Sequence, residues 1–187
     1  MKIKTDKIVL RTIEASDIDA LYKIAYQGDL EWMKWNGPYF KDPMYTYEEF
    51  SQKIAPSTYV NCKDCMLVEY EDRIIGLVTY YFDDGKLAKW PEVGILLYSK
   101  KDWNKGLGTH ILKLWIQYVF TSLPDIEHVG FTTWSKNVGM ARVGEKAGMQ
   151  LEGRIRKVRY WEDMYWDSLK FGILRDEYEI IEHQVEM

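Results

Sequence analysis

The sequence predicts a mixed α/β (α+β) fold in one domain, built around a mixed, mostly antiparallel sheet of about seven strands. Three observations lead to this prediction. The chain has 187 residues, which suits one domain with a full core and is short for two. Strand-like and helix-like hydrophobic patterns follow one another along it. No repeat, low-complexity tract or linker divides it, so we expect a single domain over residues 1–187.

The first half of the chain is expected to hold strands, helices and one long loop. "KIVLRTI" (7–13) alternates and is rich in β-branched residues, as strands are. Ser16 is predicted to cap a following helix. Residues 28–45 contain Gly, Pro and many aromatic residues and are expected to form an irregular loop, with a short helix near 46–54 after it. "CMLVEYEDRIIGLVTYYFDDG" (65–85) is typical of a β-hairpin.

The second half predicts a crossover between parallel strands. A strand at 90–98 is followed by a helix at 107–122, with apolar residues at helical spacing, and by a strand at 128–134. A strand–helix–strand order of this kind indicates one parallel pair. The remaining predicted elements are a helix at 138–147 closed by Gly148 in a left-handed C-cap, and strands near 150–161 and 166–176.

The overall composition excludes some classes of protein. Hydrophobic residues make up 47% and charged residues 29% of the chain, as in ordinary soluble globular proteins. The net charge of −4 argues against a general nucleic-acid binder. The sequence has no apolar run of about eighteen residues, and its charged N-terminus lacks the apolar core of a signal peptide. We therefore expect a cytoplasmic protein without nucleic-acid or membrane partners.

Two glycines mark the turn where the helix at 107–122 begins. Gly106 and Gly108 stand beside Lys105 and Thr109 in "WNKGLGTHIL" (103–112). A helix N-terminus presents unpaired N–H groups, and glycine lets an anion approach them, so the stretch predicts a phosphate cradle. Neither the GxxxxGK[ST] pattern nor the third glycine of the dinucleotide fingerprint is present. A turn without a ligand is the alternative.

Four stretches together carry a resemblance to a known family. "EVGILLYSKKDWNKGLGTHIL" (92–112) resembles the acyl-CoA-binding segment of the GNAT superfamily of N-acyltransferases, and "SKNVGMARVGEKAGMQLEGRIR" (135–156) resembles its next block. "IVLRTIEASDIDALYKI" (8–24) and "YWDSLKFGILRDEY" (165–178) are similar to the opening and closing elements of its RimJ/RimL-type branch. The resemblance spans nearly the whole chain. It implies one acyl-CoA N-acyltransferase domain with helices on both faces of the sheet and a splayed strand pair.

The resemblance also implies a cofactor site for acetyl-CoA and no metal. The pantetheine arm is expected along the backbone of Leu96, Leu97 and Tyr98. The pyrophosphate is expected on the N–H groups of the glycine turn, which comprises Asn104, Lys105, Gly106, Leu107, Gly108 and Thr109. Asn137 matches a family asparagine near the pantetheine. Lys146 and Arg142 could approach the phosphates, or form a solvated helix face, which is the interpretation favoured for Arg142. Trp103 departs from the family's usual Gln or Arg.

Glu92 is the candidate general base. Amine acetylation needs a neutral amine, and the resemblance places this carboxylate beside the thioester. The alternative is a solubilising carboxylate at a strand edge. The usual positions for an acid that protonates the leaving thiolate are Gly144 and Met140 here, so that proton is expected from water, from the product ammonium or from a tyrosine elsewhere such as Tyr160. A backbone N–H near Leu97 could stabilise the oxyanion.

The acceptor pocket is expected in the loop at 28–45. Trp35 and Tyr39, with Trp32 and Phe40 and nearby carboxylates, suit an organic cation, while hydrophobic cover for the helices is an equal alternative. The aromatic and acidic run at 160–167 is interpreted as a hairpin turn. Cys62 and Cys65 form a lone CxxC, which is interpreted as two reduced thiols rather than a zinc or redox site.

These features predict an N-acetyltransferase that moves an acetyl group from acetyl-CoA to a primary amine by direct attack. The acceptor could be a protein N-terminus, a polyamine, an aminoglycoside or another small amine. The alternatives are a non-catalytic acyl-CoA-binding sensor on the same scaffold and a protein-interaction module. The oligomeric state is open, and the many aromatic residues could line a homodimer interface.

Overall fold

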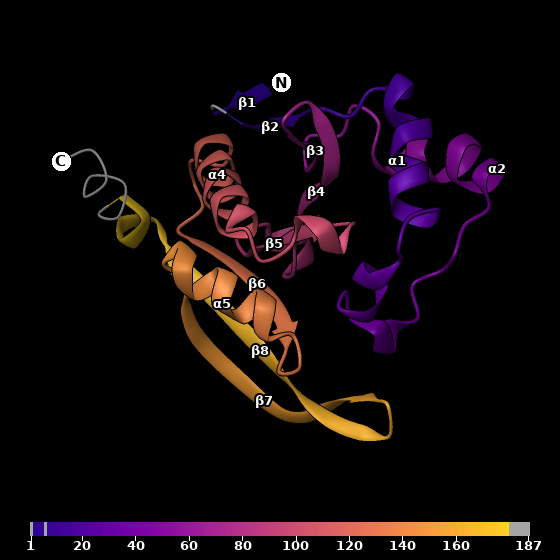
Figure 1. Ribbon diagram of the computed structural model, residues 1–187. Helices are drawn as coiled ribbons and strands as arrows, with labels where there is room; N and C mark the ends of the chain where they lie inside the picture. The colour runs from indigo at the N-terminus through magenta and orange to yellow at the C-terminus, as the bar shows by residue number, and fades with distance from the viewer. Residues whose placement is uncertain (1, 6, 180–187) are drawn as a thin grey trace. The chain divides into compact units, whose positions relative to one another are not determined.

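The computed structural model describes residues 2–5 and 7–179, which fall into two compact units (Figure 1). Unit 1 comprises the described residues up to 79 together with 95–111, and unit 2 comprises 80–94 and the described residues from 112. Three elements run from one unit into the other: β4 (Arg73–Phe82), β5 (Pro91–Leu97) and α4 (Leu107–Ser122). No helix in the described part of the chain is long and apolar enough to cross a membrane.

The strands of unit 1 are antiparallel neighbours in the order β1 (Lys2–Lys4), β2 (Ile8–Arg11), β3 (Cys65–Tyr70) and β4. The predicted hairpin is confirmed. Its turn residues Glu71 and Asp72 have φ of 49° and 59°, the left-handed pair of a type I′ turn, which matches the twist of the flanking strands. The short strand β1 was not predicted, and with it the described residues form eight strands in place of about seven.

The helical segments of unit 1 pack on its strands through a shared apolar core. Leu21, Ala25, Phe50 and Ala55 belong to it, together with Leu77 of β4. The segments are η1 (Ala15–Asp17), α1 (Ile18–Tyr26), η2 (Glu31–Lys34), η3 (Pro38–Phe40), α2 (Tyr47–Glu49), η4 (Phe50–Ile54), α3 (Ala55–Thr58) and η6 (Lys100–Asp102). The predicted loop at 28–45 thus contains two short 3₁₀ turns, and the predicted helix near 46–54 extends to Thr58.

The predicted cap at Ser16 is wrong. The chain enters α1 through the 3₁₀ turn η1, where Glu14 and Asp17 form a capping box. The Asp17 carboxylate accepts from the Glu14 backbone N–H at 2.8 Å and is also held by the guanidinium of Arg11. A carboxylate that serves both partners satisfies this turn better than a serine hydroxyl does.

The strands of unit 2 follow the order β5, β6 (His128–Trp134), β8 (Met164–Leu174) and β7 (Gln150–Trp161), and η5 (Gly85–Leu87) connects β4 to β5. β5 and β6 are parallel, with Glu92 opposite Gly130, so the predicted crossover is confirmed. The other two pairs are antiparallel. The observed bounds of α4 and β6 match the predicted ones.

One face of the unit 2 strands is covered by α5 (Val138–Ala147), which Figure 1 shows along β6 and β8. Phe131 and Phe171 stack with ring centroids 5.0 Å apart, and Gly144 of α5 packs against Phe131. α5 ends at Gly148, whose φ of 96° gives the predicted left-handed cap. Because side chains alternate along a strand, the neighbouring residues of β6 and β8 point to the opposite face.

Candidate functional site

The turn between β5 and α4, in unit 1, is open to solvent. Asn104, Lys105 and Gly106 are exposed. Asn104 and Gly106 have φ of 57° and 78°, and a Cβ added to Gly106 would meet no atom within 4 Å. The side chains of the turn therefore do not block the first N–H groups of α4, which carry its partial positive charge. This geometry suits an anion such as a diphosphate.

The same turn is anchored on both sides by polar contacts within unit 1. The buried carboxylate of Asp102 accepts from Arg73 at 3.1 Å. Asp29 Oδ2 accepts from the Ser99 hydroxyl and the Lys100 backbone N–H, each at 3.0 Å. Burial opposes the ionisation of Asp29, but its hydrogen bonds from backbone N–H groups outweigh burial and lower its pKa. The turn is thus held in place by two carboxylates that do not occupy it.

At the end of β5 nearest this turn, only some of the backbone N–H and C=O groups point toward β4. The Tyr98 N–H donates to the Ile75 carbonyl on β4 at 3.0 Å. Because the direction of the backbone N–H and C=O groups alternates along a strand, those of Tyr98 and Leu96 point toward β4. Gly76 on β4 leaves no room for a Cβ, which would lie 1.9 Å from the Leu96 carbonyl oxygen. The backbone N–H and C=O groups of Leu97, between them, point to the opposite side of the strand. Of the three residues expected to contact pantetheine, Leu97 is the one whose backbone points away from β4.

Trp103 contacts that same residue. Its indole Nε1 donates to the Leu97 carbonyl oxygen at 2.9 Å, so the side chain at the position where the family usually has Gln or Arg ties the end of β5 to the turn. The carbonyl of Leu97 is engaged by this bond, while its N–H lies on the strand edge opposite β4. Sequence reasoning identified Trp103 as a departure but missed this role.

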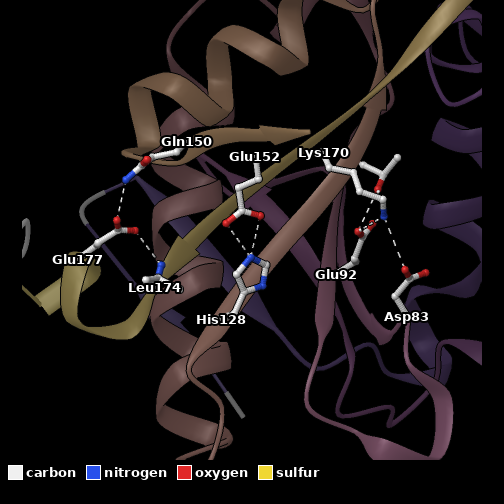
Figure 2. A network of polar contacts seen from close by, with 9 residues as sticks. Asp83, Glu92, His128, Gln150, Glu152, Lys170, Leu174 and Glu177 are labelled. Atoms are coloured by element: carbon white, nitrogen blue, oxygen red, sulfur yellow. Dashed lines mark hydrogen bonds and ion pairs between the residues drawn. The ribbon is translucent and has the colours of Figure 1, made fainter. Parts of the chain in front are cut away.

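Glu92, in unit 2, is buried within a network of side chains (Figure 2). The residue is 3% exposed. Its Oε1 accepts from the Thr132 hydroxyl at 2.9 Å and from Lys170 Nζ at 3.1 Å, and its Oε2 accepts from the Tyr81 hydroxyl at 3.4 Å. The alternative of a solubilising carboxylate at a strand edge is therefore wrong, because this carboxylate is removed from bulk solvent and paired.

Lys170, on β8, is the cation of this network. Its Nζ contacts Glu92, donates to Thr132 Oγ1 at 3.2 Å, lies 3.6 Å from Asp83 Oδ2 and sits 4.8 Å from the centre of the Trp90 ring. Figure 2 shows Lys170 between the two carboxylates. Sequence reasoning missed Lys170. Its contact with Glu92 depends on the register that sets Thr132 opposite Lys170, which the sequence alone does not reveal.

Tyr81 was also not identified from the sequence. Burial, followed by the charge of Glu92, raises the pKa of its hydroxyl to about 12. The hydroxyl therefore stays protonated at neutral pH and acts as a donor to Glu92. The cluster as a whole combines a buried carboxylate, an ammonium and two hydroxyl donors, which is an arrangement able to accept and pass on a proton.

A second polar pair lies on β6 and β7 of the same unit. His128 Nε2 is 2.9 Å from Glu152 Oε2, across Gly172 of β8 (Figure 2). A Cβ on Gly172 would come within 2.3 Å of both side chains, so a larger residue there would displace this pair from its present position. Trp90 meets the His128 ring edge to face at 6.3 Å.

The residues expected from α5 have other surroundings. Asn137 is the N-cap of α5, where its Oδ1 accepts from the Met140 backbone N–H at 3.1 Å. Arg142 and Lys146 are exposed on that helix. At Gly144, a Cβ would lie 2.6 Å from the Phe131 ring, so a tyrosine at this position would collide with that ring.

The expected acceptor residues are divided between core and surface. Trp32 belongs to the core of unit 1 and donates its indole N–H to the Ala25 carbonyl at 2.9 Å, as the structural alternative proposed. Trp35 is partly exposed, and Tyr39 packs on Phe40 with centroids 4.7 Å apart. Trp32 is therefore part of the core, while Trp35 and Phe40 reach the surface.

The CxxC residues have the character of reduced thiols. Burial raises the pKa of Cys62, and raises that of Cys65 to about 12, whereas zinc and redox chemistry need thiolates. Within residues 2–5 and 7–179, no group of three or more His, Cys, Asp or Glu side chains is placed to hold a metal ion.

Comparisons with known proteins bear on the family and the fold of this chain. The family described as the acetyltransferase (GNAT) domain matches residues 7–150. The uncharacterized N-acetyltransferase YnaD of Bacillus subtilis is 25% identical over 179 residues, which is 95% of this chain and 99% of the relative. A GNAT-family acetyltransferase from Bacillus anthracis superposes with a TM-score of 0.74 at 22% identity, covering 94% of this chain and 99% of that one. Spermidine N-acetyltransferase from Vibrio cholerae, in complex with CoA and spermine, gives 0.74 at 17% identity with the same coverage.

Proposed function

The chain belongs to the GNAT family of acetyltransferases, which use acetyl-CoA, and we propose that it transfers the acetyl group to a primary amine by direct attack, with Glu92 as the general base. The single observation that carries the base assignment is the buried, paired carboxylate of Glu92 on β5. It stands four positions before Leu96 on the strand whose end leads into the open turn.

The open turn supports the cofactor half of the proposal. The N–H groups of residues 104–109 would hold the pyrophosphate, with Lys105 supplying positive charge. The N–H of Leu97 would meet the pantetheine arm, because it is the group on this stretch that points away from β4. Asn137 and Lys146 are part of the same proposal as cofactor-binding residues, as the family resemblance implies.

The proposed reaction requires two proton transfers. An alkylammonium with a pKa near ~10 has to lose a proton before it attacks, and the Glu92 carboxylate accepts it. The leaving thiol has a pKa near ~8.5, so the thiolate can be protonated by solvent or by the ammonium product without a dedicated acid. Gly144 has no space for one. Direct transfer needs no acyl-enzyme, which suits two thiols that are held protonated.

The acceptor is proposed as a protein N-terminus or a small amine, bound with the help of Trp35 and Tyr39. The closing block at 165–178, which resembles the RimJ/RimL-type branch, supports the first, and a polyamine or aminoglycoside belongs to the second. We place the enzyme in that branch and in the cytoplasm as part of the same proposal.

A second candidate is a non-catalytic acyl-CoA sensor. The observation in its favour is that both oxygens of Glu92 already accept hydrogen bonds, one of them from Lys170. In a catalytic site, one of these donors has to yield to an acceptor amine or a water.

Thiol release measured on a panel of amines separates the two candidates. The purified chain is incubated with acetyl-CoA and with peptides bearing free N-termini, polyamines or aminoglycosides, and free CoA is titrated against time. We expect release above the hydrolysis background with at least one amine class. Thermal stabilisation by CoA without release with any class would identify a sensor.

A further inference from the structure

We propose that Lys170 is itself an acetyl acceptor, so that the enzyme acetylates its own chain at this residue. The inference rests on the proposed function, since it uses the same acetyl-CoA and the same base. What is new is the acceptor: an amine of the protein stands beside the carboxylate that is to deprotonate an external amine.

The position of Lys170 Nζ meets the geometric requirement for such a substrate. A general base has to lie within about 2.6–3.2 Å of the group whose proton it takes. Lys170 Nζ is 3.1 Å from Glu92 Oε1, and its other contacts, with Thr132, Asp83 and the Trp90 ring, hold it there. The amine is therefore presented to the base by a fixed set of partners rather than by chance collision.

Lys170 remains accessible although its carboxylate partner does not. Its side chain is 28% exposed, whereas that of Glu92 is 3% exposed. The amine is thus open to a reagent that arrives from solvent, while the base stays shielded from bulk water. All the residues of this cluster belong to unit 2, so the acceptor and the base are parts of one compact unit.

Lys136 offers an internal comparison in the same unit. Its side chain is 30% exposed, pairs with Glu162 and lies over the Trp134 and Trp166 rings. It thus shares with Lys170 its exposure, an ion pair and an aromatic contact. The difference is the carboxylate: that of Glu162 is exposed and belongs to a hairpin turn, so it is not a candidate base.

The step balances without a further reactant. Glu92 takes one proton from the Lys170 ammonium, and the freed lone pair on Nζ forms a C–N bond to the acetyl carbonyl carbon. The C–S bond then breaks, and its electron pair leaves on the CoA sulfur. The thiolate takes the second Nζ proton, and the proton on Glu92 passes to solvent. The amide that results is uncharged, so Asp83 and Glu92 lose their ion pairs with Lys170.

Site-resolved mass spectrometry tests the proposal. The full chain, purified in unacetylated form, is incubated with isotopically labelled acetyl-CoA and no external amine, and label is followed at Lys170 and Lys136. We expect Lys170 to be labelled at least ~10-fold faster than Lys136, the low end of what general-base assistance with positioning provides. The Lys170 rate should be independent of protein concentration, because acceptor and base share one chain.

Two further measurements test whether labelling of Lys170 depends on CoA binding and on Glu92. Unlabelled CoA should slow labelling at Lys170 and leave Lys136 unchanged, which needs no variant at all. Glu92→Gln should reduce the Lys170 rate to that of Lys136, and Lys136→Arg should leave the Lys170 rate as it was. Equal rates at the two lysines, or a Lys170 rate insensitive to both CoA and Glu92→Gln, overturn the inference in favour of chemical acetylation. Turnover of an external amine with Lys170 unmodified overturns it and leaves the proposed function intact. Absence of both turnover and labelling overturns both.

Discussion

The turn after β5 (residues 104–109) and the cluster around Glu92 differ in the groups that form them: backbone in the turn, side chains in the cluster. The turn offers backbone N–H groups, is exposed, and owes its shape to a few consecutive residues with left-handed backbone at Asn104 and Gly106. The cluster offers side chains, buries its carboxylate, and gathers Tyr81, Glu92 and Lys170 from three different strands. A site made of main chain tolerates changes of side chain, and a site made of side chains does not.

This difference sets how each region should respond to substitution. The turn should fail when its backbone is distorted or covered, and its failure should appear in cofactor affinity. The cluster should fail when its carboxylate is altered and should weaken when a donor to that carboxylate is removed, and both losses should appear in turnover. Four substitutions, ordered from the largest expected effect to the smallest, test that separation.

The largest effect is expected from Gly106→Val. A β-branched side chain is strained at a φ of 78°, and it also covers the N–H groups proposed to hold the pyrophosphate. Loss of two or more charge-assisted hydrogen bonds, each worth about 1.5–3 kcal/mol, predicts a rise in the Kd for CoA of at least ~10²-fold and up to more than ~10⁴-fold, measured by calorimetry.

Gly85→Val is the matched control for that change. Gly85 also has a left-handed φ, of 60°, and open space around its absent Cβ, but it lies in the connection between β4 and β5. The two variants share the backbone strain, so an equal loss of CoA affinity in both would show that strain, and not the anion site, causes the effect.

Glu92→Gln comes next, and it should separate turnover from binding. The amide keeps the shape of the side chain but cannot take up the amine proton, so kcat/KM should fall ~10²–10⁴-fold while the Kd for CoA stays within about twofold. Stopped assays of thiol release and calorimetry on the same preparation give both numbers. Glu162→Gln, which also removes a carboxylate paired to a lysine, should retain full activity. If Glu92→Gln changes neither quantity, the base is another group.

The two regions also differ in how far the sequence predicts them. Gly106, Gly108 and the helix after them are consecutive, and local patterns of glycine and apolar spacing are what single-sequence reasoning detects. The same reasoning gave the correct bounds for α4, whose periodic pattern is long, and for β6 and α5. It missed β1, because three residues are too few to form a pattern.

The cluster around Glu92 shows which contacts the sequence alone does not predict. Glu92 was identified as a candidate through a family resemblance, but its partners Lys170 and Tyr81 lie 78 and 11 residues away along the chain. Their meeting depends on strand order and register, since a shift of one residue would turn Lys170 to the other face. Gly172 and Gly144 make the same point, because the side chains that leave no room for a Cβ come from other strands.

Trp103→Phe tests an effect of intermediate size in the turn. The substitution keeps the ring but removes the indole N–H that holds the Leu97 carbonyl. A hydrogen bond of this kind contributes about 1 kcal/mol, so the KM for acetyl-CoA should rise ~5-fold with kcat nearly unchanged. Trp166→Phe removes a similar indole bond, to the Trp161 carbonyl in the β7–β8 hairpin, and should leave the KM unaltered. A fall in kcat with constant KM would instead assign Trp103 to the chemical step.

Tyr81→Phe should produce the smallest effect, and its pH dependence is the informative part. The hydroxyl donates to Glu92 across a long 3.4 Å contact, so its removal should lower kcat/KM only ~2–5-fold. Because burial and the neighbouring charge of Glu92 raise the pKa of Tyr81 to about 12, the hydroxyl stays protonated up to pH ~10 and should contribute no alkaline limb to the wild-type profile. The profiles of wild type and Tyr81→Phe should therefore be parallel between pH 6 and pH 10, to within about 0.2 units in either limb. Tyr47 is 47% exposed and its hydroxyl also donates to a carboxylate, that of Asp19, so Tyr47→Phe is the matched control and should leave the rate unchanged. An alkaline limb that disappears in Tyr81→Phe would mean that this hydroxyl gives up its proton during turnover, and that the cluster contains an acid as well as a base.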